Sequence, residues 1–424
     1  MVLTFMRSSH NAIPRKLAHT RRQSTAARPS RAGSCADKIS RRGREAQGRR
    51  GPGVADPRQQ LESSPCRVAA AKKGRRLRTT SLTEMLEIEL PIIQAPMAGA
   101  QAGAMTVAVS NAGGLGSLPC AMLGPDAMRK ELETIRAGTI RPFNVNFFCH
   151  RTPVANAARE AAWRQALAPY YRELGVDPGS IPAGPGRLPF DTAAADALEP
   201  FAPAVVSFHF GLPAPDLLAR VRRWGSKILC SATTVDEARW LEAQGVDAII
   251  AQGVEAGGHR GIFLSDDLTT QSGTFALLPQ VVRAVRCPVI AAGGVADAQG
   301  VAAAMALGAA GVQVGTAYLL CPESTITPVH RKALKGDAAR HTALTNLFTG
   351  RPARGIVNRI IRELGPISGI APQFPLATAA IMPLRAKAEA AGSGDFSPLW
   401  CGQNAGGCRE VPAAVMTRDL ASAL

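Results

Sequence analysis

Two glycine-containing pairs end apolar runs in the second half of the chain, and their residue types suit phosphate binding. Gly293-Gly294 follows the run VIAA, and Gly315-Thr316 follows the run GVQV. Backbone N–H groups converging from two such loops can bind a phosphate dianion, because glycine lets the ligand approach the backbone. The Thr316 hydroxyl can add a further donor. The pairs predict a phosphate site, with tight strand-to-helix turns as the plainer alternative.

Two histidines have surroundings that suit a general base. His209 lies near the end of the apolar run AVVSFHF, and His259 follows Gly257-Gly258 in AQGVEAGGHRG. A partly desolvated imidazole stays neutral near pH 7 and can accept a proton from a carbon acid. A histidine on an apolar strand is also a common hydrogen-bonded core residue, and His259 could instead hold phosphate.

Three further stretches place polar or flexible side chains where a ligand could lie. In FNVNFF, Asn144 and Asn146 share one face of a strand by the two-residue period, and an amide both donates and accepts. Gln252 and Glu255 flank the same glycine loop as His259. In QAPMAGA, Met97 can form an apolar platform beneath a flat ring. These stretches predict a polar site around a planar ligand.

Short apolar runs alternate with alanine-rich helical patterns from residue 88 onward, which is typical of successive βα units. Strands are expected at Pro91–Gln94, Leu115–Leu118, Phe143–Phe148, Ala204–Phe210, Lys227–Ser231, Asp247–Ala251, Pro288–Ala292 and Gly311–Val314. Eight such units predict an α/β fold, a (β/α)8 TIM barrel. Phosphate commonly binds after strands 7 and 8 of such a barrel, where the two glycine pairs fall.

Helix signals refine this arrangement. Helices are expected to begin at Asp236 and Asp297, each closed by a glycine. The connection 151–203 is longer than a plain crossover and contains a sequence pattern typical of helices. We therefore expect residues 85–424 to form the barrel, with a helical insertion near 151–203 and a C-terminal helical segment making a smaller, mainly helical subdomain.

The charge is concentrated at one end of the chain. Of the formal net charge of +17, most comes from residues 1–80, which hold 20 Lys and Arg against 4 Asp and Glu, while the rest holds 29 against 28. Residues 1–84 have too few large apolar side chains to offset the entropy of ordering, so we expect a disordered basic extension. It could be a targeting segment, a basic arm, or the result of a misplaced start upstream of Met85.

Cysteine usage and hydropathy limit the setting. Nine cysteines are scattered without a Cys-x-x-Cys pair, which favours a reduced compartment and no metal site. No apolar run reaches the roughly 18 residues of a membrane span. We expect a cytoplasmic protein, or a mitochondrial one if the extension is a targeting segment, with no membrane partner.

Several motifs together resemble the nitronate monooxygenases, formerly called 2-nitropropane dioxygenases. They are PIIQAPMAGA, RPFNVNFFCH, VVSFHFGLP, AQGVEAGGHRG, VIAAGGVAD, GVQVGTAYL, TGRPARG and DFSPLWCGQ, and they span about residues 86–410. Each motif alone is weak, whereas the ordered set is specific.

The resemblance implies one non-covalent FMN and a set of residues around it. Its implied FMN contacts are Asn146, Gln252, Gly257, Gly294, Gln313, Val314, Gly315 and Thr316, with Met97 near the ring and Gln403 returning toward it. His209 is the implied catalytic base, and His259 is the second candidate. The implied reaction is oxidation of alkyl nitronates such as propionate 3-nitronate with O2 to a carbonyl compound and nitrite, in a detoxifying monomer or homodimer.

Other interpretations stay open at this point. An NAD(P)H-dependent flavin reductase, of the enoyl-acyl-carrier-protein or quinone type, can use the same scaffold. A flavin-free phosphate-binding barrel, such as an isomerase or aldolase, usually needs a lysine or paired carboxylates that the strand ends here lack. The basic extension could bind nucleic acid, but the barrel itself is not expected to.

Overall fold

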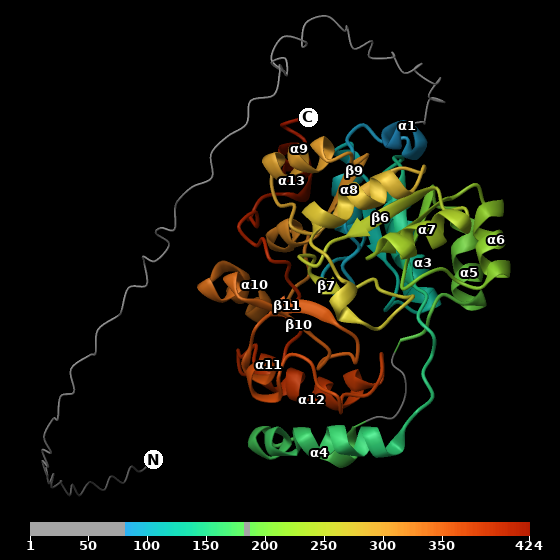
Figure 1. Ribbon diagram of the computed structural model, residues 1–424. Coiled ribbons are helices and arrows are strands. Elements are labelled where there is room, and N and C mark those ends of the chain that lie inside the picture. The colour runs from blue at the N-terminus through green and yellow to red at the C-terminus, as the bar shows by residue number, and fades with distance from the viewer. Residues whose placement is uncertain (1–80, 182–186) are drawn as a thin grey trace, which may run out of the picture. The chain divides into compact units, whose positions relative to one another are not determined.

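The computed structural model describes residues 81–181 and 187–424 (Figure 1). The extension expected at 1–84 therefore lies outside the described residues, except for its last four. Those four begin helix α1 (Leu82–Leu86). The Ser81 hydroxyl accepts from the Glu84 backbone, and the Glu84 carboxylate accepts from the Ser81 backbone, which forms a capping box. Leu82 and Leu86 are buried against the strands, so residues before Met85 already pack on the barrel.

Eight parallel strands form the main sheet. They are β1 (Ile92–Gln94), β2 (Gly116–Pro119), β3 (Phe143–Phe148), β4 (Val205–His209), β5 (Lys227–Ala232), β6 (Ala248–Gln252), β8 (Val289–Ala292) and β9 (Gly311–Val314). They pair in the order β1-β9-β8-β6-β5-β4-β3-β2. Leu115, just before β2, exchanges backbone hydrogen bonds with Ile92 and Gln94 of β1, which brings the two edges of the sheet together. The predicted (β/α)8 barrel is confirmed.

The strands lie where the apolar runs predicted them. Phe143–Phe148 and Gly311–Val314 have the predicted bounds, and the others differ by one residue at one or both ends. Nearly every strand residue is buried, because the helices cover one face and the barrel interior covers the other. Apolar runs of this kind are therefore a reliable signal for barrel strands.

Helices connect the strands and extend past the barrel. They are α2 (Gly103–Asn111), α3 (Pro125–Gly138), α4 (Ala157–Leu174), α5 (Thr192–Leu198), α6 (Pro215–Arg223), α7 (Val235–Ala243), α8 (Thr274–Ala284), α9 (Ala298–Ala306), α10 (Pro328–Lys335), α11 (Arg359–Leu364), α12 (Ala377–Ala390) and α13 (Ala413–Leu420). Asp297 caps α9 as predicted, accepting from the Gly300 backbone at 2.7 Å. Helix α7 begins one residue before Asp236, because the Thr234 hydroxyl caps it.

A second hydrophobic cluster lies outside the barrel. Helix α4, from the 151–203 connection, lies beside α12 (Figure 1), and the Tyr171 hydroxyl of α4 donates to the carbonyl of Ala380 at 2.6 Å. This part also contains an antiparallel sheet that the sequence did not predict, with the order β10 (Thr342–Thr345), β11 (Ala353–Ile356) and β7 (Gly258–His259). Strand β7 lies in the loop after β6, so this sheet joins the second cluster to the mouth of the barrel.

Among the helices of the described residues, none is both long and apolar enough to cross a membrane.

Candidate active site

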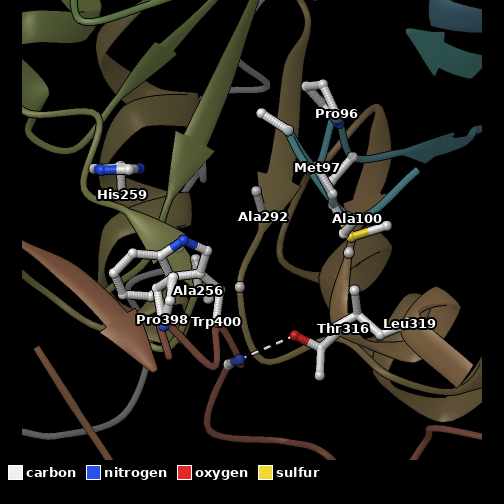
Figure 2. Close-up of a pocket in the computed structure, with 18 of the residues that line it drawn as sticks. Pro96, Met97, Ala100, Ala256, His259, Ala292, Thr316, Leu319, Pro398 and Trp400 are labelled. Atoms are coloured by element: carbon white, nitrogen blue, oxygen red, sulfur yellow. Dashed lines mark hydrogen bonds between the residues drawn. The ribbon is translucent and has the colours of Figure 1, made fainter. Parts of the chain in front are cut away.

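A large cavity lies at the carboxyl ends of the barrel strands and encloses about 1700 Å³, its open mouth included. The predicted site residues that line it are Met97, Asn146, His209, Gln252, Gly257, His259, Gly294, Gln313, Gly315 and Thr316. Figure 2 shows two facing walls, with His259 and Trp400 on one and Pro96 and Met97 on the other.

Two of the implied FMN contacts do not line the cavity, and neither does Asn144, which is buried and donates to the Ser117 hydroxyl. Val314 is buried in the hydrophobic core of the barrel wall. The Gln403 side chain is exposed, while its backbone N–H donates to the Glu255 carbonyl at 2.9 Å. The neighbours Gly402 and Asn404 line the cavity instead. The C-terminal segment thus returns to the barrel mouth as the resemblance implied, although through other residues.

At the first glycine pair, the backbone conformation favours glycine, independently of any ligand. Gly293 and Gly294 have φ values of +106° and +78°, which side chains disfavour. A Cβ at Gly293 would lie 2.9 Å from the Ala256 nitrogen, so the neighbouring loop occupies that space. A Cβ at Gly294 would meet only Glu255 side-chain carbons, at 3.7 and 3.8 Å. The tight-turn explanation therefore accounts for Gly293, while Gly294 leaves its backbone open to a ligand.

The C-terminal segment 400–404, which we call the strap, connects the two glycine pairs. The Gly402 backbone donates to the Thr316 hydroxyl at 2.9 Å, the dashed line in Figure 2. The Asn404 side chain donates to the Gly294 carbonyl, also at 2.9 Å. Because Thr316 accepts from the strap, its hydroxyl hydrogen remains available for an anion.

Three amide side chains present polar atoms to the cavity. Asn146 of β3 donates through Nδ2 to Ser207, which leaves Oδ1 as an acceptor. Gln252 of β6 is fixed at both ends, accepting from the Gly261 backbone and donating to the His259 carbonyl. Gln313 Oε1 is buried and has no hydrogen-bond partner among the described residues. A buried acceptor without a partner is costly, and a donor from a bound molecule would satisfy Gln313.

His209 uses both ring nitrogens within the protein. Nε2 lies 3.2 Å from the His259 carbonyl oxygen, and Nδ1 lies 3.0 Å from the Ser231 hydroxyl. A carbonyl only accepts, so Nε2 carries the hydrogen and Nδ1 accepts from Ser231. His209 is therefore held firmly, with neither nitrogen directed to a substrate.

His259 has one engaged and one unengaged nitrogen. Nε2 lies 3.0 Å from the Thr349 hydroxyl, which itself donates to the Arg351 carbonyl. The hydroxyl can therefore accept the Nε2 hydrogen, and this chain fixes the tautomer with a bare lone pair on Nδ1. Within the described ranges, Nδ1 makes no hydrogen bond, and the ring lines the cavity. This is the geometry of a proton acceptor.

Both imidazoles are held in the neutral form. Burial lowers the pKa of His209 to about 3. The hydrogen bond to the His259 carbonyl raises this pKa, and the charges of Arg351 and Arg260 lower it. Burial also lowers the pKa of His259 well below its usual value, and the charge of Arg187 is the next largest cause. A neutral imidazole at physiological pH is the form that can act as a base.

Some lining residues were not predicted from the sequence. Trp400 packs against His259 with ring centroids 5.5 Å apart and ring planes tilted by 58°, and it belongs to the motif DFSPLWCGQ. His330 of α10 donates to the Trp400 carbonyl and lines the cavity, although nothing in its local sequence marks it. Arg187 and Arg385 also line the cavity; Arg187 lies in a segment without periodic signal, whereas Arg385 lies on helix α12.

A metal centre finds no support in the part of the chain that the structure describes. No group of three or more His, Cys, Asp or Glu side chains there could hold a metal ion.

Comparison with known proteins gives consistent relatives. The nitronate monooxygenase family model matches residues 79–421. A protein named nitronate monooxygenase from Paraburkholderia phytofirmans is 45% identical over 350 residues, covering 80% of this chain and 93% of the relative. One of the same name from Pseudomonas aeruginosa is 42% identical over 355 residues, covering 82% of this chain and 99% of the relative.

Solved structures agree on the fold. A nitroalkane oxidase from Streptomyces ansochromogenes has a TM-score of 0.72 and 40% identity, covering 81% of this chain and 97% of that one. FabK from Thermotoga maritima is more distant, with a TM-score of 0.60 and 28% identity, covering 82% and 96%.

Proposed function

This chain belongs to the nitronate monooxygenase family, and we propose that it oxidises alkyl nitronates with O2 to a carbonyl compound and nitrite, using FMN held at the barrel mouth. One observation carries the proposal. A neutral imidazole with a bare Nδ1, that of His259, lines the same cavity as two glycine pairs suited to phosphate. We further propose propionate 3-nitronate as a substrate and detoxification as the role.

The residues present fit FMN. A flavin ring and its ribityl chain carry N–H and O–H donors. One of these could donate a hydrogen bond to the buried Gln313 Oε1, which has no partner among the described residues. Gly294 and Thr316 can donate to the phosphate, and Met97 offers an apolar surface to the ring. When bound, FMN supplies the electron-accepting chemistry and the reactivity toward O2 that the side chains themselves do not have.

We assign the proton-accepting role to His259. The resemblance pointed first to His209, but both nitrogens of His209 are engaged, whereas Nδ1 of His259 is not. In this proposal His259 Nδ1 accepts the α-proton of a neutral nitroalkane, and Thr349 holds the ring in the required tautomer. His209 acts as a positioning residue, because it donates to the backbone carbonyl of His259. With a nitronate no proton is removed, and the neutral imidazole contacts the substrate.

A visible spectrum and an NADH assay test the cofactor and the reaction class. The purified full chain should show a flavin spectrum, and heat should release FMN. Addition of NADH without air should leave that spectrum unchanged over the time in which a nitronate bleaches it. Rapid bleaching by NADH would instead support a reductase, and a protein that cannot take up FMN would contradict the cofactor assignment.

A further inference from the structure

Arg187 is a half-buried cation on the cavity wall that has no matching anion among the described residues. It follows the undescribed residues 182–186 and lines the same cavity as His259. In the described ranges its guanidinium forms no ion pair and no hydrogen bond, and its charged end lies over the Phe374 ring, with Cζ 5.8 Å from the centroid. A desolvated guanidinium without a carboxylate is rare in proteins and is a feature of anion sites.

The carboxylates that line the cavity are already used by other groups. Glu389 accepts from Arg385 at 2.8 Å and from the Ser397 hydroxyl at 2.7 Å. Glu255 accepts from the Thr274 backbone at 2.8 Å. Neither therefore neutralises Arg187, and the charge on Arg385 has its own partner. The surplus positive charge of this wall belongs to Arg187.

Arg187 also lies close enough to the proposed base to affect it. Burial lowers its own pKa, and Arg385 lowers it further. Its charge in turn lowers the pKa of His259 and of His150. Phe374 links the groups in space, because its ring centroid is 5.4 Å from that of His259. Arg187 and His259 thus border the same side of the cavity.

The carbon that loses a proton in a nitroalkane is bonded directly to the nitro group. A base that reaches this carbon therefore has the nitro oxygens one bond further away. We propose that Arg187 binds the oxygen atoms of the nitronate group beside His259 and thereby selects the anionic substrate over the neutral nitroalkane. This inference rests on the proposed function and names the residue that recognises the substrate.

The test compares Arg187→Met and Arg187→Lys with the wild-type holoenzyme. Arg172→Met is the matched control, because Arg172 is an exposed arginine near the end of α4 and does not line the cavity. Substrates are ethyl nitronate, propionate 3-nitronate and neutral nitroethane. Nitrate serves as an unreactive planar anion, and its binding is measured by calorimetry.

For Arg187→Met we expect KM to rise about tenfold or more for both nitronates, and nitrate to bind weaker by a similar factor, as for loss of a charged hydrogen bond. The KM for nitroethane should change by less than about threefold, since a neutral molecule gains little from the cation, whereas its kcat should fall because proton removal creates the nitronate charge beside Arg187. Arg187→Lys should give intermediate values, and Arg172→Met should match the wild type.

Two results would overturn the assignment. Similar losses of kcat for all three substrates, with the KM for both nitronates and nitrate binding unchanged, would mean that Arg187 only supports the structure. A loss confined to propionate 3-nitronate would mean that it binds the carboxylate and not the nitronate group. If the wild type oxidised no nitronate, the proposed function would fail, while the nitrate titration would still decide whether Arg187 is an anion site.

Discussion

His209 and His259 are neighbours in the cavity, but within the described residues only His259 leaves a ring nitrogen unengaged. The His259 carbonyl accepts from His209, and the Thr349 hydroxyl accepts from His259 Nε2 in the assigned tautomer. A side chain with a bare Nδ1 can accept a proton, whereas one with both nitrogens engaged can only hold its neighbour in place.

Asparagine substitutions separate the two roles. His259→Asn should lower kcat/KM for neutral nitroethane by about 100-fold or more, the usual contribution of a general base, and by less than about tenfold for ethyl nitronate. His209→Asn should lower both by a similar, smaller factor, because it acts through position. Steady-state oxygen uptake measures each value. A selective loss of nitroethane turnover in His209→Asn, with equal losses in His259→Asn, would reverse the assignment.

The Thr349 hydroxyl offers a second test at this scale. Thr349 is buried, and Thr349→Val keeps its shape while removing the acceptor for His259 Nε2–H. We expect a roughly tenfold loss of kcat on nitroethane, in keeping with an outer partner that orients a reacting group. Thr349→Ser, which keeps the hydroxyl, is the control and should stay near the wild type. An unchanged kcat in Thr349→Val would show that the tautomer is fixed in another way.

The sequence revealed these site residues unevenly. The histidines and amides stand at the ends of strong apolar runs, so their place at the barrel mouth could be predicted. Thr349 and Arg187 come from segments without periodicity, and only tertiary packing brings them to His259. Val314 and Gln403 were named only because they belong to the motifs. The alternation of side chains along β9 places Val314 in the hydrophobic core, and the Gln403 side chain points from the strap to solvent.

At the scale of elements, the strap is the feature that completes the site. It passes so close to the loop after β6 that a Cβ at Gly257 would lie 2.6 Å from the Gly402 nitrogen and 2.7 Å from the Cys401 carbonyl carbon. Real Cβ atoms do not approach backbone atoms so closely, so any side chain at Gly257 must move the strap. The glycine is thus required by the protein itself.

Gly257→Ala should therefore weaken FMN binding. We expect the affinity to fall about tenfold or more, and the apparent melting temperature of the holoenzyme to fall, since overpacking of this kind costs about 1–3 kcal/mol. Flavin fluorescence quenching measures the affinity. Gly124→Ala is the control, because a Cβ there meets nothing within 4 Å and its φ is −71°. Unchanged FMN affinity in Gly257→Ala would mean that the strap does not hold the cofactor.

Elements also differ in how well the sequence predicts them. The barrel strands are buried on both faces, so their apolar runs gave their positions within one residue. Strands β10 and β11 read TALT and ARGI, which show no alternation. Strand β11 pairs with β10 on one side and with β7, from the loop after β6, on the other, and this second, long-range contact has no local signal.

At the scale of the whole molecule, buried neutral histidines link stability to pH. Burial lowers the pKa of His150 and of His330 to about 4 and that of His209 to about 3, and it lowers that of His259 well below its ordinary value. The unfolded chain binds these protons below about pH 6.5, whereas the folded chain does not. The stabilisation is present above pH 6.5 and is lost as the pH falls toward the folded-state values.

Urea unfolding at pH 7.5 and at pH 5 tests this linkage. His150, His209 and His330, whose pKa values in the folded protein are about 4 or 3, should each cost about 2 kcal/mol of unfolding free energy at pH 5, because pH 5 is about 1.5 units below the unfolded pKa and each unit is worth about 1.4 kcal/mol. His150→Phe provides the comparison, because the His150 ring packs edge-on against Phe374 and a phenyl ring can do the same. This variant should lose less stability between the two pH values. An identical pH dependence would contradict the buried neutral state of His150.

The proposed reaction requires the enzyme to consume a nitronate together with O2. The most direct measurement records oxygen uptake and nitrite release together, with the purified full chain, propionate 3-nitronate and no NADH. We expect oxygen uptake that begins when the nitronate is added, and nitrite that accumulates with it. Oxygen uptake that requires NADH, with no nitrite from the nitronate, would contradict the proposed reaction.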